Sequence, residues 1–248
     1  MRLANLMMLL TASLLCYACA TAGSSRKEGI YHYQMGVSFF NEGNMTSALT
    51  ELTKAEEYDS SNPELYNYLG MAYYNKKKLD IAEKEYKTAL SINPKYCDAR
   101  NNLGVVYLDM QKWDDAIAQF SQVSEDVFFH NQVAARINLG LAYMGKGDNP
   151  KSLSLFRGVV ADYPRDPRGR MNLGRVYSAL EKYDLAINEY KRAVELEKDY
   201  AVAHYFLGLA YIKTKNNIGA QAAFKEVIRI APDSEIGQLS REYIDTLK

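Results

Sequence analysis

The feature that most constrains the fold is a glycine that returns at almost constant intervals and is followed three residues later by an aromatic residue. Successive glycines lie 34, 34, 36, 34 and 34 residues apart. They are Gly36, Gly70, Gly104, Gly140, Gly174 and Gly208, and the aromatic residues are Phe39, Tyr73, Tyr107, Tyr143, Tyr177 and Tyr211. A period of this length is typical of stacked helix–turn–helix units. The sequence therefore predicts six copies of one structural unit.

The second half of each copy repeats a small residue and then a bulky one. Twelve residues after each glycine stand Ala48, Ala82, Ala116, Ser152, Ala186 and Ala220. Four residues further on stand Leu52, Tyr86, Phe120, Phe156, Tyr190 and Phe224. We expect the small positions to let neighbouring helices approach, while the bulky side chains fill the space between them. One helix pair buries too little apolar surface to be stable alone, so the copies should stack into one elongated core.

Residues that end helices divide the chain into repeats. Proline and Asn-Pro pairs mark the junctions, and no useful stretch alternates with period two, so we expect an all-α protein without a sheet. The predicted repeats cover residues 29–62, 63–96, 97–132, 133–166, 167–200 and 201–234, with a two-residue insertion in the third. In residues 235–248, Ile236, Leu239, Tyr243 and Leu247 recur at helical spacing. That apolar stripe predicts a helix that caps the last repeat.

These residues resemble the tetratricopeptide repeat, a family of paired-helix repeats, from about residue 29 to residue 234. The departures are small. Ser152 stands where alanine is usual, and prolines end only some of the repeats. The resemblance implies a right-handed superhelical solenoid in which the first helix of every repeat lines the concave face.

The first 22 residues differ from the rest of the chain. A single arginine precedes a short apolar segment and then small residues, which is typical of a secretory signal. Cys19 follows Ala18 and resembles the lipidated cysteine of bacterial lipoproteins, so we assign residues 1–18 to a signal peptide and 19–28 to a lipidated tether. Cys16 is the competing site, and cleavage at Ala18 or Ala20 without lipid is a further alternative. A membrane-spanning anchor is the last alternative, although the apolar stretch is short for crossing a membrane.

The resemblance to lipoproteins also implies a location. Lipoproteins without aspartate after the cysteine are typically passed to the outer membrane, and Ala20 follows Cys19 here. We therefore expect the protein on the periplasmic face of the outer membrane. The residues between Cys19 and the first helix span at most roughly 30 Å, so the first repeat should lie close to the membrane.

Composition argues against several classes of function. Lys plus Arg number 30 and Asp plus Glu number 30, and no basic stripe favours nucleic acid. The histidines, His32, His130 and His204, lack companions at metal-ligand spacing. The tyrosines fall mostly on packing positions. We expect no metal, no cofactor and no enzymatic activity.

The resemblance to tetratricopeptide repeats places certain residues in a groove. In the first three repeats these are Ile30, Tyr33, Val37, Phe40, Asn41, Asn67, Met71, Tyr74, Asn101, Val105 and Leu108. The first repeat contributes mostly apolar residues, which favour contact with a partner protein. Asn67 and Asn101 suit the backbone of an extended segment or amphipathic helix. The alternative is that superhelical twist buries these positions between repeats.

A signal ending at a cysteine, a short tether, six repeats and an insertion after the third together resemble pilotin-like lipoproteins of type IV pilus biogenesis. The residues concerned are 101–113, 124–129 and 138–140. The resemblance implies a protein that helps the pilus secretin localise and assemble into its ring. A general periplasmic scaffold for envelope or cell-wall machinery is the alternative. A cytoplasmic adaptor requires that the amino-terminal segment is no signal.

Overall fold

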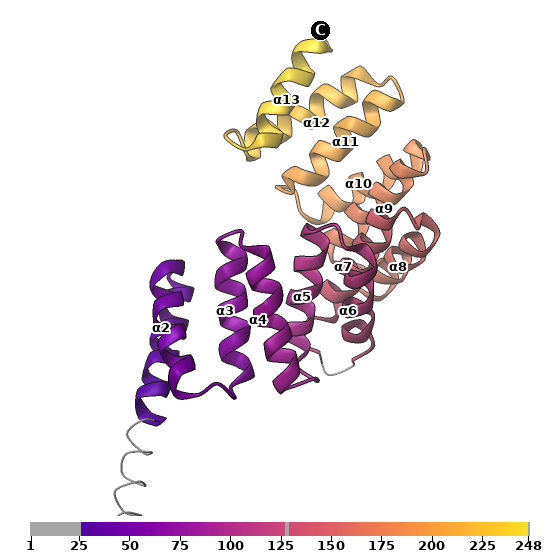
Figure 1. Ribbon diagram of the computed structural model, residues 1–248. Helices are drawn as coiled ribbons and strands as arrows, with labels where there is room; N and C mark the ends of the chain where they lie inside the picture. The colour runs from indigo at the N-terminus through magenta and orange to yellow at the C-terminus, as the bar shows by residue number, and fades with distance from the viewer. Residues whose placement is uncertain (1–25, 127–128, 248) are drawn as a thin grey trace, which may run out of the picture. The chain divides into compact units, whose positions relative to one another are not determined.

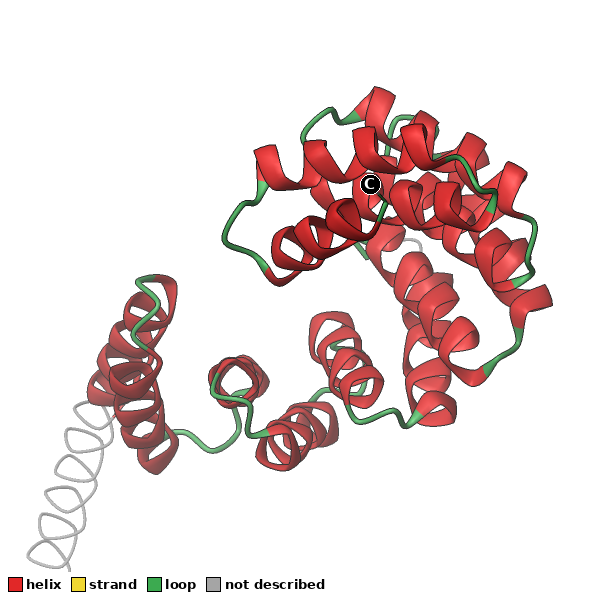
Figure 2. Ribbon diagram, turned by 90° about the horizontal axis from the view of Figure 1, so that it is seen from above, coloured by secondary structure: helices red, strands yellow, loops and turns green. Residues whose placement is uncertain are grey.

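The computed structural model describes residues 26–126 and 129–247, and every regular element within them is a helix (Figure 2). Contacts divide the chain into two compact units, one up to residue 110 and one from residue 111. Within each unit, consecutive helices pack in pairs and each pair packs on the next. The predicted all-α solenoid of tetratricopeptide repeats is confirmed.

The first unit contains the helical residues 26–41 and four further helices (Figure 1). These are α2 Met45–Tyr58, α3 Pro63–Asn75, α4 Leu79–Ile92 and α5 Cys97–Asp109. Residues 26–28, which the sequence assigned to the tether, already belong to the first helix. The signal peptide, Cys19 and the rest of the tether lie outside the described residues.

The second unit continues the alternation of helix and turn. Its helices are α6 Trp113–Glu125, α7 Gln132–Lys146, α8 Asn149–Asp162, α9 Pro167–Ala179, α10 Tyr183–Leu196, α11 Ala201–Lys213, α12 Asn217–Ile230 and α13 Glu235–Thr246. At the insertion between α6 and α7, Phe129 is buried and Gln132 Nε2 donates to the Asp126 carbonyl over 2.8 Å. The inserted loop is therefore tied to the start of α7.

The repeated glycine packs directly against the second helix of its pair. A Cβ atom added to Gly70 would lie 2.6 Å from Tyr86 Cε1, and one added to Gly174 would lie 2.6 Å from Tyr190 Cε1. The same 2.6 Å approach occurs between Gly36 and Leu52, between Gly140 and Phe156, and between Gly208 and Phe224. Each of these five glycines thus makes room for the bulky residue sixteen positions later, and that residue is fully buried or nearly so.

Ser152, which departs from the alanine of the other repeats, is accommodated by a hydrogen bond. Its side chain is completely buried, and its Oγ donates to the Gly140 carbonyl over 2.9 Å. A buried hydroxyl would otherwise cost stability. The substitution therefore keeps the small residue's packing role and satisfies its own polar atom.

The turn inside each repeat contains a residue in the left-handed backbone region. In order, these residues are Gly43, Lys77, Gln111, Gly147, Glu181 and Lys215, with φ between 57° and 84°. They recur with the same spacing as the repeated glycines, because every repeat uses the same turn. Only two of them are glycine, although this region is unfavourable for other residues. The turn geometry is thus set by packing of the helix pair and not by the turn residue.

Side-chain caps begin several helices and fix where they start. Asn44, Asp148, Asn216 and Ser234 each accept a backbone N–H from three residues further on. Asn62 caps α3 by accepting from the N–H groups of Glu64 and Leu65, and Asp166 caps α9 by accepting from the N–H of Arg168. A proline follows each of these two caps in the first helical turn. Such caps satisfy N–H groups that have no partner within the helix.

The last helix covers the open side of the sixth repeat. Tyr243 of α13 stacks on Phe224 of α12, with ring centroids 5.0 Å apart and planes 8° apart. Ile236, Leu239 and Leu247 are half-buried, whereas Gln238, Arg241 and Asp245 are exposed. The predicted capping helix, with one apolar and one hydrated face, is present.

Candidate functional site

The predicted groove residues of the first unit lie on three helices: the helical residues 26–41, α3 and α5. On the first of these, Tyr33, Val37 and Phe40 are half-buried, whereas Ile30 is 48% exposed and Asn41 is exposed. The later positions Met71, Tyr74, Asn101, Val105 and Leu108 are also half-buried. Partial exposure is the state expected of side chains that pack on their neighbours and leave one side free.

An aromatic cluster joins the first helix to α3. The Tyr68 ring meets Tyr33 at a centroid distance of 6.0 Å and Phe40 at 5.6 Å, edge to face in both cases. Sequence reasoning missed Tyr68, because it lies one position beyond the groove positions that the resemblance supplied. An aromatic side chain directly after Asn67 was the signal available. The cluster holds Tyr33 and Phe40 in place, which suits a surface preorganised for a partner.

A carboxylate lies beside this cluster. Burial raises the pKa of Tyr33 well above its usual value, and Glu64 adds to the effect through its charge and a hydrogen bond. Burial likewise raises the pKa of Tyr96 to about 12, with further contributions from Asp98 and Glu64. Both phenols therefore remain protonated at neutral pH and can donate hydrogen bonds. The surface combines apolar rings with phenol and carboxylate groups at its edge.

The two asparagines predicted to hold a partner's backbone differ in the structure. Asn67 is only 5% exposed, and its amide is already used. It accepts from Asn102 Nδ2 over 3.0 Å, and its own Nδ2 contacts Met71 Sδ at 3.6 Å. The Asn67 amide is therefore already engaged within the protein, because α5 packs close enough to contact it. That Asn67 belongs to a partner-binding groove stays a prediction. Asn101 differs, since its Oδ1 is a buried acceptor without a hydrogen-bond partner in the described residues.

The far end of the surface is partly closed by the chain's own contacts. Tyr74 donates a hydrogen bond to Asp109 Oδ2 over 2.8 Å, and Lys77 Nζ lies 5.5 Å from the Tyr74 ring centroid. Burial and the Asp109 carboxylate raise the pKa of Tyr74 to about 12. Tyr74 thus joins α3 to α5, so the surface most open to a partner lies around the first helix.

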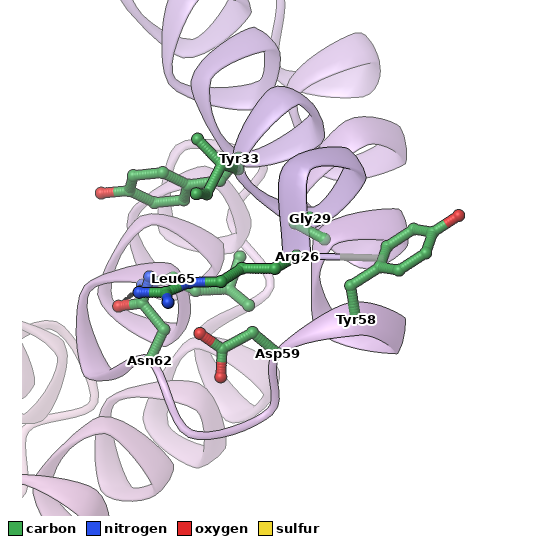
Figure 3. Close-up of a pocket in the computed structure, with 9 residues that line it drawn as sticks. Arg26, Gly29, Tyr33, Tyr58, Asp59, Asn62 and Leu65 are labelled. Carbon is green, nitrogen blue, oxygen red and sulfur yellow. Dashed lines mark hydrogen bonds between the residues drawn. The ribbon is translucent and has the colours of Figure 1, made fainter. Parts of the chain in front are cut away.

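A pocket of about 510 Å³ opens beside Ile30 and Tyr33, where the first helix meets the end of α2 and the start of α3. Figure 3 shows the Arg26 side chain extending above Asp59 towards Asn62, with the Tyr33 ring on another side. Leu65 and Ala55 supply apolar lining. The Asn62 side chain is committed to capping α3, which leaves Arg26 as the cation at the pocket's edge.

Two of the three histidines, His32 and His204, contact other groups in the described residues. His32 Nδ1 lies 2.6 Å from Glu51 Oε2, and its ring stacks on Tyr58 at 5.9 Å. His204 Nε2 lies 2.9 Å from the Lys198 carbonyl. No group of three or more His, Cys, Asp or Glu residues suited to a metal occurs among residues 26–126 and 129–247. Within the same ranges, no helix has both the length and the apolar character that a membrane crossing requires.

The fold and this surface define a helical repeat scaffold, and family models agree. A TPR-repeat model matches residues 36–77, 72–111 and 174–215. One tetratricopeptide-repeat model matches residues 101–167 and 137–177, and another matches residues 201–234. Together the matches run without a gap from residue 36 to residue 234. The chain belongs to the tetratricopeptide-repeat family, whose members are generally non-catalytic and bind other proteins.

A curated relative is the uncharacterised protein ycf37 of Porphyra purpurea, which is 35% identical over 72 residues. The match covers 29% of this chain, and the chain spans only about 42% of that relative's length.

Several solved structures share the fold over most of the chain. PilF of Pseudomonas aeruginosa has a TM-score of 0.70 at 17% identity, covering 88% of this chain and 99% of PilF. PilW, described as a widely conserved type IV pilus biogenesis factor, has a TM-score of 0.75 at 18% identity, covering 85% and 97%. YrrB, a TPR protein with an unusual peptide-binding site, has a TM-score of 0.53 at 19% identity, covering 77% and 97%. At these identities the likeness shows the fold alone.

Proposed function

We propose that this protein is a lipid-anchored scaffold on the periplasmic face of the outer membrane, where it binds a segment of the pilus secretin and assists its localisation and assembly. The observation that carries the binding role is the row of partly exposed apolar side chains on the first helix, Ile30, Tyr33 and Phe40, beside a pocket of about 510 Å³. Apolar groups gathered in this way are typical of protein interaction sites.

Two further observations support the setting in pilus assembly. The fold resembles PilF and PilW over most of their length, and PilW is described as a type IV pilus biogenesis factor. The amino-terminal sequence provides Cys19 after an apolar segment, as a lipid anchor requires. The rigid aromatic cluster around Tyr68 favours a partner segment that buries apolar side chains, either extended or as an amphipathic helix.

The binding role is tested with purified secretin subunits captured on the immobilised protein. Ile30→Glu is the main variant, because its exposed position tolerates charge without loss of folding. Ile218→Glu on α12 is the matched control, since Ile218 is 84% exposed and lies in the other unit. We expect the first variant to lose secretin capture and the control to retain it, with unchanged helical content in both.

The alternatives give different results in the same experiment. Equal capture by both variants would place the secretin elsewhere on the molecule. If the wild-type protein captures no secretin but recovers cell-wall or envelope proteins through Ile30, the general periplasmic scaffold is the correct function. Secretin multimers counted in membranes of cells that produce each variant give an independent readout.

The anchor is tested by acyl labelling and membrane fractionation. We expect Cys19→Ser to lose the label and leave the outer-membrane fraction, while Cys16→Ser keeps both. Loss of label from Cys16→Ser instead would transfer the anchor to Cys16. Unlabelled wild-type protein released as a soluble periplasmic form would show ordinary signal cleavage.

A further inference from the structure

Arg175 on α9 differs from the other arginines of the same helix. Arg168 forms an ion pair with Asp166 at 2.6 Å, and Arg170 forms one with Glu189 at 3.1 Å. Arg175 Nη1 instead donates to the amide oxygen of Asn172 over 3.1 Å. Among the described residues, no carboxylate lies within ion-pair distance of Arg175. Its positive charge therefore has a neutral partner only.

The surroundings of Arg175 make this unusual. Its guanidinium lies over the Phe206 ring, 5.2 Å from the centroid. Burial lowers the pKa of Arg175, against the opposing influence of Tyr190 and Tyr200. A cation withdrawn from water without a counter-charge is unfavourable, whereas a paired one is far less so. An incoming carboxylate would supply the missing charge.

An apolar pocket of about 450 Å³ in the second unit has as one of its walls the Phe206 ring that Arg175 covers. Its walls include Ser178, Phe206, Leu209, Ile212 and Tyr243. Phe206 is the same ring that Arg175 covers, and Ser178 lies one helical turn further along α9. The volume falls within the range of ligand pockets and suits a bulky apolar side chain.

A second cation lies on a different helix and lines this pocket directly. Lys213, at the end of α11, belongs to the pocket wall and is exposed. No carboxylate in the part of the chain that the structure describes forms an ion pair with Lys213. Arg175 on α9 therefore packs on the Phe206 ring that lines the cavity, and Lys213 on α11 lines the cavity directly. Neither cation has a carboxylate partner among the described residues.

We propose that this pocket is a second docking site, which binds an acidic segment of a partner protein. A bulky apolar side chain of the segment enters the cavity, and flanking carboxylates pair with Arg175 and Lys213. Two cations on separate helices call for two separate carboxylates, which acidic side chains within a segment supply and a single chain terminus does not. Charge-assisted hydrogen bonds to guanidinium are strong and directional. This site is independent of the surface around Ile30.

The probe is a fluorescein-labelled heptapeptide with one phenylalanine between two aspartates and with glycine elsewhere, acetylated and amidated so that it has no terminal carboxylate. Its binding to the full-length protein in detergent is followed by fluorescence anisotropy. We expect saturable binding that weakens with salt. Replacing both aspartates by asparagine, or the phenylalanine by alanine, should weaken binding about tenfold or more.

Variants of the protein locate the site. Arg175→Gln should weaken binding of the aspartate peptide about tenfold. Arg168→Gln is the matched control on the same helix, because Arg168 is already paired with Asp166. Lys213→Gln should also weaken binding, and its exposed position keeps folding intact. Ile30→Glu should leave this binding unchanged, so failure here is distinguishable from failure of the secretin role.

Three outcomes would overturn the proposal. Binding of the asparagine peptide as tight as that of the aspartate peptide would remove the role of charge. Full affinity of Arg175→Gln would remove the assigned residue. Binding seen only with a free terminal carboxylate would show that the occupant is a chain end and not an internal acidic segment.

Discussion

Individual residues in this protein act through contacts that are repeated from one helix pair to the next. In five of the repeats, the glycine faces the bulky residue sixteen positions later, and a methyl group on that glycine has no space. Interiors packed at this density respond to the addition of one carbon atom. Residues that break the repeated pattern, such as Ser152, do so with a compensating hydrogen bond.

Gly174→Ala should destabilise the second unit. The added Cβ would lie 2.6 Å from Tyr190 Cε1 and 2.8 Å from Cδ1, and the Tyr190 ring is fully buried and cannot move aside. Overpacking of this kind costs about 1–3 kcal/mol of unfolding free energy. Urea denaturation measures this loss.

Gly158→Ala is the control. Its Cβ would meet only the flexible end of Arg136, so we expect no loss and up to about 1 kcal/mol of gain in helix stability. Equal losses for both variants would contradict this account.

Glu85 gives the first unit a pH-dependent stability. Burial raises the pKa of the Glu85 carboxyl above its usual 4.5, Lys84 opposes this, and the charge of Glu56 adds to it. A carboxyl group whose pKa is higher in the folded protein than in the unfolded chain costs no stability at pH values below its unfolded-state pKa. As the pH rises through the folded-state pKa, ionisation of the buried group lowers the stability of the fold. We expect Glu85→Gln to be more stable than wild type at pH 7 and to lose that advantage below about pH 4. The measurement is the urea midpoint for unfolding of α4 between pH 3 and pH 7. A greater stability of Glu85→Gln that persists at pH 3 would exclude Glu85 as its source.

The elements of the structure are helices whose ends are fixed by turns of one geometry. Each turn within a repeat needs a left-handed residue, and Lys77, Glu181 and Lys215 adopt that conformation without being glycine. The packing of the helix pair imposes the conformation, because the same φ recurs whatever residue is present. Non-glycine residues in this region carry a cost of about 1–2 kcal/mol.

Glu181→Gly and Lys215→Gly should therefore each stabilise the second unit. Relief of the left-handed strain exceeds the added entropy of glycine in the unfolded chain, so the net gain is about 0.5–1 kcal/mol per site. Thermal unfolding followed by circular dichroism measures it. Gly147→Ala is the converse control, since φ is 84° there, and it should lower stability by about 1 kcal/mol. A loss of stability in both glycine variants would show that the turns are not strained.

The molecule as a whole is held together by contacts between sequence neighbours. In the second unit, α9 contacts α8, α10, α7 and α11, and in the first unit α3 contacts α2, α4 and α5. Arrays of this kind behave approximately as sums of repeat stabilities and nearest-neighbour interfaces. A local defect should therefore remain local.

Hydrogen exchange of Gly174→Ala provides the test. We expect faster exchange in α9, α10 and the helices that contact them, with exchange in α3 and α4 unchanged, because only neighbouring interfaces lose stability. Gly70→Ala in α3 should give the reciprocal result, with the change confined to the first unit. Uniform acceleration throughout the described residues in either variant would show that the whole chain unfolds as one cooperative system.

The repeat architecture was predictable because it depends on local spacing. Within a helix, residues three and four apart share a face, so the glycine, the small residue and the bulky residue reveal which faces pack. The apolar stripe of residues 235–248 identified α13 by the same rule. The left-handed turn residues also follow the period, but only Gly43 and Gly147 signal them by residue type.

By itself, then, the sequence determined the helix pairs, their number and their capping. Only the tertiary structure decided that Asn102, 35 residues away, occupies the amide of Asn67. It also decided that Arg175 meets Phe206 of another helix and no carboxylate. Helix geometry fixes which side chains share a face, whereas the partner that each side chain finds across an interface depends on how closely, and at what height, two helices pack.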